Sequence, residues 1–198
     1  MYLQYKQFLQ RYVSLNFIEW NLIKSKLKIK HYRKGDIIHN IGNTYKHLMF
    51  INYGLARGFI IDEHGKDTTW SVYFNDKNSH MTNLLVVDYE SFLTQKGSKL
   101  EIVALEDSQV VMTDYKDIEF IYNHTKKGDR LGRLLAQEAY MYLHNFIIQR
   151  QTQTAKERFE SFVRDTPHLL EKIPQCHIAT LLGITPQHLS RLKHEHKH

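Results

Sequence analysis

The sequence predicts an α+β protein: an antiparallel β-roll with flanking helices, then a long helix and a small helical domain. Three observations support this prediction. Apolar residues recur at helical spacing before residue 27 and after residue 114. The segment between them alternates with period two and is interrupted by glycine turns. A helix-turn-helix pattern lies within residues 175–194. The closely spaced strands, with no helical pattern between them, favour an antiparallel roll over a parallel sheet.

The spacing of apolar residues in the N-terminal part predicts one or two short helices followed by the strands of the roll. The apolar residues at helical spacing are Leu3, Phe8, Leu9, Tyr12, Phe17, Ile18, Leu22 and Ile23. The β-rich runs are residues 37–38, 47–51, 55–61, 68–74, 100–105 and 109–112. Turns that contain Gly35, Gly42, Gly54 and Gly65 separate the first four of these runs. We therefore assign residues 1–127 to a β-roll domain of the effector-binding type with N-terminal helices.

The C-terminal part returns to helical periodicity. Ile118, Phe120 and Ile121 predict a short helix, and residues 128–150 predict a rod of about 33 Å. A helix of this length usually finds a partner, and the simplest is its own copy across a two-fold axis. The alternative is a helix that packs only on its own roll. The residues expected at a dimer interface are Leu131, Leu134, Leu135, Tyr142 and Phe146.

Residues 151–198 predict a small helix-turn-helix domain that begins after a polar hinge at residues 151–153. Thr154 and Glu157 have the spacing of a capping box for its first helix. Gly183 lies where the turn requires a positive φ, Thr185 can cap the last helix, and Pro186 suits the first turn of that helix. Ile178, Ala179, Leu182, Ile184, Leu189 and Leu192 have the spacing that two crossing helices need. Such a pair lays its second helix in the major groove of DNA. The alternative is an ordinary helical hairpin.

The outward positions of that second helix are the candidate DNA contacts. They are Thr185, Pro186, Gln187, His188, Ser190, Arg191 and Lys193. Arg191 is the main candidate for direct readout, since arginine pairs bidentately with guanine. His188, Lys193 and Lys197 are expected on backbone phosphates. Two of these positions also have a structural explanation, because Pro186 suits a first helical turn and Ser190 suits a solvated helix surface.

Composition bounds the class of protein. The chain has 198 residues, 42% of them hydrophobic, and no apolar run long enough to span a membrane. Its single cysteine, Cys176, excludes a disulfide or a cysteine-ligated cluster within one subunit. The polar N-terminus lacks a secretory pattern, so we expect a cytoplasmic protein. The formal charge of +6 suits a DNA-binding protein, although many proteins without that function are mildly basic.

The chain resembles transcription regulators of the CRP/FNR family, and most closely a Bacteroidetes-type branch of it. The resemblance rests on the turn Lys34-Gly35-Asp36, on Gly54-Leu55-Ala56-Arg57, and on residues 178–191. It implies a roll of the cyclic-nucleotide-binding (jelly-roll) type and a homodimer formed through the long helix. It also implies double-stranded promoter DNA and RNA polymerase as partners. The sequence stops soon after the second helix of the pair, so we expect no final β-wing.

The effector position departs from that family's cyclic-nucleotide pattern. The family places a glycine and a glutamate at the start of a short helix and an arginine ten residues after the glutamate. Here Val87 and Asp88 stand at the first two positions, and Ser98 stands at the arginine position with Lys99 beside it. Without a guanidinium to grip a phosphate, cyclic AMP is not expected. Asp88, Ser98 and Lys99 remain candidate ligand residues, with ordinary surface charges as the alternative for Asp88 and Lys99. Haem, another small-molecule effector or no ligand at all remain open.

An enzyme and a ligand sensor or scaffold are the two alternatives to a DNA-binding regulator. An enzyme with a cupin-like barrel would need clustered metal ligands, but the histidines of the β region are scattered, and no catalytic motif is present. Those histidines are His31, His39, His47, His64 and His80. We therefore expect neither an enzyme nor a metal site. The other alternative is a ligand sensor or scaffold that does not bind DNA.

Two charged segments have both a functional and a structural interpretation. The lysine run Lys24, Lys26, Lys28 and Lys30 predicts either a second electropositive patch or an edge strand protected from pairing. The histidines at positions 194, 196 and 198 predict either weak metal binding or a solvated tail.

Overall fold

The β-roll is confirmed in a computed structural model that describes residues 2–76, 79 and 82–196. Two four-stranded antiparallel sheets form it, in the orders β1-β8-β3-β6 and β2-β7-β4-β5. The strands are β1 Leu27–Tyr32, β2 Ile37–His39, β3 His47–Tyr53, β4 Leu55–Ile61, β5 Asp67–Phe74, β6 Leu85–Val86, β7 Leu100–Ala104 and β8 Ser108–Asp114. Of these, β1 and the two-residue β6 are absent from the runs predicted above.

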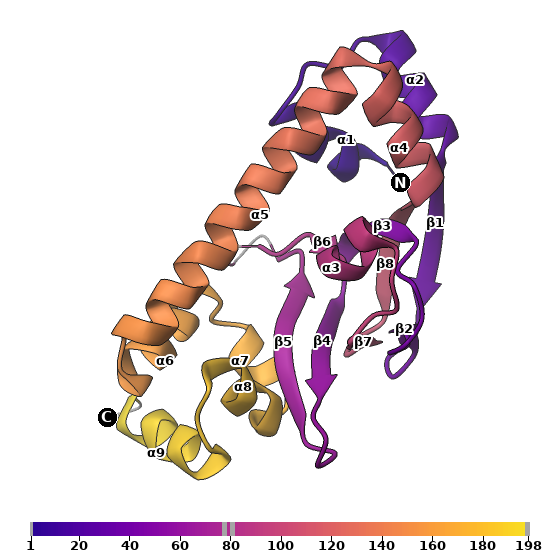
Figure 1. Cartoon of the computed structure of the whole chain (residues 1–198). Helices are drawn as coiled ribbons and strands as arrows, with labels where there is room; N and C mark the ends of the chain where they lie inside the picture. The colour runs from indigo at the N-terminus through magenta and orange to yellow at the C-terminus, as the bar shows by residue number, and fades with distance from the viewer. Residues whose placement is uncertain (1, 77–78, 80–81, 197–198) are drawn as a thin grey trace.

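Most of the helices lie near the two ends of the long helix α5, whereas α3 lies in the roll (Figure 1). Figure 1 shows α1, α2 and α4 around its upper end and α6, α8 and α9 around its lower end, with the roll alongside. The helices are α1 Leu3–Gln10, α2 Phe17–Ser25, α3 Tyr89–Thr94, α4 Tyr115–His124, α5 Lys126–Thr152, α6 Ala155–Asp165, α7 Leu169–Lys172, α8 Gln175–Leu182 and α9 Pro186–His196. The fold class is therefore α+β. No helix within the described ranges combines the length and the apolar character needed to cross a membrane.

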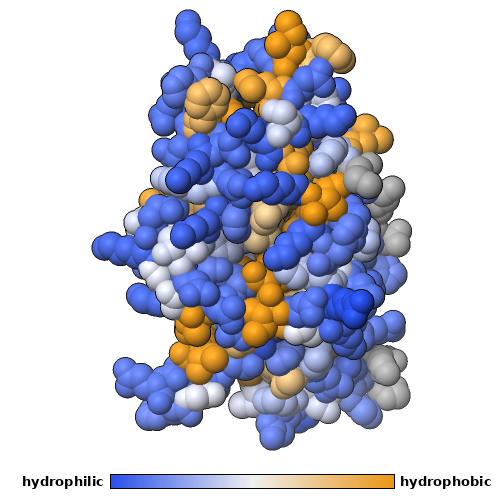
Figure 2. Space-filling view, turned by 90° about the vertical axis from the view of Figure 1, so that its right-hand side faces the viewer, coloured by the Kyte–Doolittle hydropathy of each residue, from blue (hydrophilic) through white to orange (hydrophobic). Residues whose placement is uncertain are grey.

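The lysine run does not form a free cationic patch. Lys28 and Lys30 lie on β1, which is an edge strand of its sheet. The Lys28 Nζ lies 2.5 Å from an Asp114 carboxylate oxygen, and the Lys26 Nζ lies 3.0 Å from one of Asp117. Figure 2 shows the face of the molecule on the β1 side, which is largely hydrophilic with small separate hydrophobic patches. These pairs favour the protected-edge interpretation.

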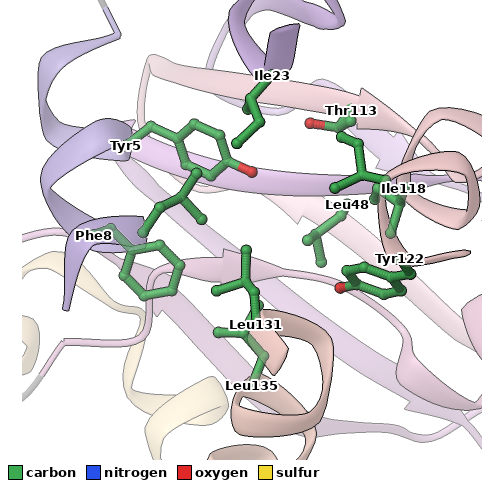
Figure 3. Close-up of a pocket in the computed structure, with 11 residues that line it drawn as sticks. Tyr5, Phe8, Ile23, Leu48, Thr113, Ile118, Tyr122, Leu131 and Leu135 are labelled. Carbon is green, nitrogen blue, oxygen red and sulfur yellow. The ribbon is translucent and has the colours of Figure 1, made fainter. Parts of the chain in front are cut away.

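The upper end of α5 is buried against the N-terminal helices and the roll of the same chain. Leu131 and Leu135 of α5 join one apolar cluster with Tyr5 and Phe8 of α1 and Ile23 of α2. Figure 3 shows these side chains around a cavity of about 30 Å³, which has room for about one water molecule. Burial there raises the pKa of Tyr5 to about 12. The cavity is too small for an effector.

The helix-turn-helix forms with the predicted capping. Gly183 ends α8 in the left-handed region at φ +69°. The Ile184 amide donates to the Ala179 carbonyl at 2.9 Å, which closes the turn. The Thr185 Oγ1 accepts from the His188 amide at 3.2 Å and so caps α9. The capping box of Thr154 and Glu157 also forms, at the start of α6. The four-residue α7 is an element that the sequence did not predict.

Replacing Gly183 with alanine is expected to destabilise this turn for two reasons. An L-residue in the left-handed region costs about 1–2 kcal/mol. A Cβ at Gly183 would also lie 2.6 Å from the Arg150 Nη2. Arg150 would then have to move away from the Leu181 carbonyl, to which its Nη1 donates at 3.1 Å. The free energy of unfolding, measured by urea titration, should fall by more than the strain term alone.

Gly65 provides the matched control for that substitution. Its φ is +76°, but no atom lies within 4 Å of the position that a Cβ would occupy. Gly65→Ala should therefore show the backbone strain alone. Equal losses in the two variants would show that the Arg150 contact adds nothing to the stability of the turn.

Candidate nucleic-acid interface

Helix α9 presents its polar face to solvent and buries its apolar face. Leu189 and Leu192 are buried against the rest of the helical domain. The candidate DNA contacts Thr185, Pro186, Gln187, Ser190 and Arg191 are exposed, and His188 and Lys193 are half-buried. All seven thus retain some exposure to solvent. Lys197 lies outside the described residues.

The two helices of the motif pack closely where small residues allow it. Ile178 and Ala179 of α8 and Leu189 of α9 are fully buried, and they share one cluster with Phe159 of α6. A methyl side chain at Ala179 lets the two helices approach each other. This packing gives α9 a fixed position relative to α8, so that whatever orients α8 also orients the exposed face of α9.

Two arginines bind the C-terminal end of α8, and sequence reasoning did not identify either of them. The Arg150 Nη1 donates to the Leu181 carbonyl, and the Arg158 Nε donates to the Leu182 carbonyl at 3.0 Å. Cations at a helix C-terminus satisfy its unpaired carbonyls and complement the helix dipole. The hinge predicted at residues 151–153 is reduced to one residue in the structure. Helix α5 continues to Thr152, so Gln153 alone lies between α5 and Thr154, the cap of α6.

The first helix of the motif, α8, packs directly on strand β5 of the roll. The Thr69 amide donates to the Thr180 Oγ1 at 3.1 Å, and the two hydroxyl oxygens lie 2.8 Å apart. The Thr69 hydroxyl also lies 3.0 Å from the His177 carbonyl, to which it can donate. Leu55 and Val72 of the roll lie in the same buried cluster as the core of α8 and α9. The roll and the helix-turn-helix therefore share a continuous interface.

A buried arginine lies in that interface. Arg57 of β4 is only 2% exposed, and its guanidinium donates to the Thr69 Oγ1 and to the Asp67 carboxylate, both at 2.9 Å. Its Nη2 is buried and has no hydrogen-bond partner within the described residues. The hydrogen bond from Arg57 holds the pKa of Asp67 below its ordinary value. Burial first, and the charge of Arg57 second, lower the pKa of His177.

A second cavity, of about 320 Å³, lies farther along the same interface. Gly54, Phe74 and Glu106 of the roll line it, together with His168 and Lys172 of the helical part. The Lys172 Nζ lies 3.3 Å from a Glu106 carboxylate oxygen across the gap. The interface is thus closely packed at α8 and looser at α7.

The residues at the expected effector position bind one another. Asp88 caps α3 by accepting from the Ser91 amide at 3.2 Å, and its other oxygen accepts from the Ser98 hydroxyl at 2.5 Å. Lys99 is exposed, with its Nζ 3.9 Å from a Glu90 oxygen. Asp88 is therefore a half-buried charge at a helix end, and Lys99 is an exposed charge, so both fit the alternative of charges at the end of a strand or helix.

The interior of the roll beside this position is filled by tyrosine rings. Tyr45 and Tyr73 are buried, and their hydroxyls donate to the carbonyls of Val86 at 2.6 Å and Val87 at 3.1 Å. Burial raises the pKa of both hydroxyls above the ordinary value. Neither of the two cavities described above is lined by Asp88 or Ser98.

The residues predicted at the dimer interface separate into two groups. Leu131 and Leu135 are buried within their own chain, so they are not available to a second subunit, and this corrects the predicted interface. Leu134 and Phe146 are half-buried, and Tyr142 is exposed. The exposed large apolar residues of α5 are Tyr140, Met141, Tyr142, Leu143, Ile147 and Ile148.

No metal centre is formed by the residues that the structure describes. Within them, no three His, Cys, Asp or Glu side chains are placed to hold an ion. Cys176 is exposed as a free thiol. His80 and His198 lie outside the described ranges. The ring of His196 packs edge-on against Phe159, with ring centroids 5.8 Å apart.

Comparison with known proteins identifies this architecture. No family model and no curated protein matches the sequence. Among solved structures, FixK2 from Bradyrhizobium japonicum is 16% identical with a TM-score of 0.67, and the match covers 85% of this chain and 83% of that one. A CRP/FNR-family regulator from Eubacterium rectale is 19% identical with a TM-score of 0.67, covering 90% and 82%. The catabolite activator protein of Thermus thermophilus is 20% identical with a TM-score of 0.52, covering 93% and 84%. The chain therefore has the fold of the CRP/FNR transcription regulators.

Proposed function

We propose that this protein is a cytoplasmic, sequence-specific DNA-binding transcription regulator of the CRP/FNR family that acts as a homodimer. The exposed polar face of α9, with Arg191 on it and with α8 packed behind it, is the observation that carries the proposal. Its partners are double-stranded DNA, a second copy of the chain and RNA polymerase. Membership of a Bacteroidetes-type branch stays a prediction, and catalysis is no part of this proposal.

The DNA contacts divide by chemistry. Arg191 has the geometry to pair with guanine O6 and N7, and Gln187 can pair with adenine. His188 and Lys193, at the edge of the exposed face, suit backbone phosphates, while Thr185, Pro186 and Ser190 lie between the two groups. Phosphate contacts fix the position of α9 on the duplex, and the base contacts supply the specificity.

The second copy is proposed to pack along a stripe of α5 that the chain itself leaves exposed. Tyr140, Leu143 and Ile147 are exposed and follow one another at intervals of three and four residues. That spacing forms one helical face and is typical of the seam between paired helices. The stripe lies well away from the face of α5 that carries Leu131 and Leu135. A parallel pair of α5 helices would place two α9 helices on the same side of the dimer.

We also propose that the roll acts without cyclic AMP. The Ser98 hydroxyl donates a hydrogen bond to the Asp88 carboxylate, and the rings of Tyr45 and Tyr73 fill the space beside the pair. Isothermal titration with cyclic AMP should therefore give no heat of binding, and the ligand should not raise the melting temperature. Saturable binding of cyclic AMP that Ser98→Ala abolishes would contradict this proposal and would show that Ser98 is a ligand-binding residue.

Selection of bound fragments from a random duplex library tests the function itself. The proposal predicts a two-fold-symmetric site whose half-sites lie about one helical turn, 10–10.5 base pairs, or a multiple of it apart. A pool without enrichment would contradict DNA readout and would favour a ligand sensor or scaffold built on this fold. Enrichment of a single asymmetric element would contradict the dimer.

A further inference from the structure

We propose that Thr69 of the roll and Thr180 of α8 are positioning residues for DNA recognition, forming an interdomain latch with Arg57. The latch fixes the direction in which α9 faces, although none of its members lies on the exposed face of α9. This inference rests on the proposed DNA-binding function and adds a role for the β4–β5 pair. Its first support is the geometry of Thr69, whose amide and hydroxyl both bind α8 while its Oγ1 accepts from Arg57.

A β-bulge places Thr69 on the side of the sheet that faces α8. In the β4–β5 pair, Gly58 lies opposite Ser71 and Phe59 lies opposite Thr69, so Trp70 has no partner across the ladder. In a regular strand Thr69 and Val72 would point to opposite faces, because side chains alternate. The extra residue brings both onto the face that packs against the helical domain. The local irregularity of β5 thus produces the contact.

Leu55 and Val72 supply apolar contacts between the roll and the helical domain, and Thr69 adds directional hydrogen bonds to α8. Gln153 alone separates α5 from the cap of α6, and the cavity beside Glu106 and Lys172 leaves the α7 side of the interface loosely packed. Arg57 contributes a buried charge whose Nη2 has no hydrogen-bond partner within the described residues, so its burial is costly and its bond to Thr69 matters. In the latched arrangement Gln187, Ser190 and Arg191 of α9 are exposed, so the latch leaves the proposed DNA-binding face accessible.

Removing the hydroxyl of Thr180 is the direct test. In Thr180→Val without DNA, the Thr69 amide and the amides of α8 should exchange with solvent faster than in the wild type. The substitution removes the acceptor of the Thr69 amide and the contact between the two hydroxyls. Affinity for the selected operator should fall at least about three- to tenfold, the range typical of one lost hydrogen bond. The slope of log affinity against log salt should stay unchanged, because no phosphate contact is removed.

Three further variants distinguish loss of the latch from a general failure of the protein to fold. Thr69→Val keeps the backbone amide bond to Thr180 but loses the hydroxyl contacts, so the amides of α8 should exchange faster and affinity should fall. Thr69→Ser, which keeps the hydroxyl, should behave like the wild type in both measurements. Thr68→Val, an exposed neighbour on β5, should change neither. Should Thr69→Val fail to fold because the Arg57 Nε loses its partner, Thr180→Val still decides, since Thr180 does not touch Arg57.

The outcomes separate the latch from the proposed function. Faster exchange in α8 together with unchanged affinity would overturn the positioning role, and unchanged exchange in Thr180→Val would overturn the latch. A wild type that shows the protected Thr69 amide but selects no DNA sequence would contradict the proposed function and leave the latch contact standing.

Discussion

Arg191→Ala is expected to abolish preference for the selected operator while leaving the dimer intact. A bidentate arginine–guanine pair contributes about 1–3 kcal/mol of discrimination, so each half-site should lose about ten- to a hundredfold. The side chain is exposed and does not belong to the buried cluster of α8 and α9, so stability should not change. Competition between operator and unrelated DNA, followed by fluorescence anisotropy, measures the loss.

Lys193→Ala is the matched control for Arg191→Ala. Both remove a cation from the same helix, but Lys193 is assigned to a phosphate. Its loss should weaken binding to every sequence about equally and lower the salt slope by about one for each half-site. Unchanged specificity in Arg191→Ala would refute the assignment of that residue, and a sequence-dependent loss in Lys193→Ala would show that the two roles are exchanged.

Charges on the exposed stripe of α5 are expected to separate the subunits. Leu143→Glu combined with Ile147→Glu would place carboxylates at two positions of the proposed seam. We expect monomers by light scattering at micromolar concentration. Operator affinity should fall about a hundredfold or more, because two linked half-site contacts gain about 10²–10⁴ over one.

Met141→Glu serves as the control for that pair. Met141 is an exposed apolar residue of the same helix, but it lies off the stripe of Tyr140, Leu143 and Ile147. This variant should remain a dimer. A dimer that persists in the double variant, or one that Met141→Glu disrupts instead, would contradict the proposed seam.

The elements with strong local signals could be predicted from the sequence. The turn at Gly183, the cap at Thr185 and the capping box at Thr154 depend on backbone conformation and on neighbouring residues, and all three form. The strand β1 appears in the sequence only as the edge-strand interpretation of the lysine run, and there the lysines are the polar half of a regular alternation. The strand β6 was missed because two residues carry no periodicity. A short helix such as α7, between two prolines, is likewise determined by its tertiary contacts.

Residues whose role depends on a distant partner could not be predicted. Periodicity marks Leu131 and Leu135 as apolar, but it cannot tell a partner subunit from the chain's own α1 and α2. Thr69 belongs to no motif, since its contacts with α8 join residues more than a hundred positions apart and depend on a bulge. Arg57 lies in the run of residues 54–57 that carries the resemblance, but nothing in that run signals its bond to Thr69. Only the folded chain brings these groups together.

Interference by guanine methylation on the selected operator tests the central claim most directly. A methyl group on N7 of one guanine in each half-site is expected to block the wild type, because Arg191 needs that atom. The same methyl groups should have little effect on Arg191→Ala, which has already lost the contact. Binding by the wild type that is indifferent to methylation throughout both half-sites would contradict recognition of the major groove by α9.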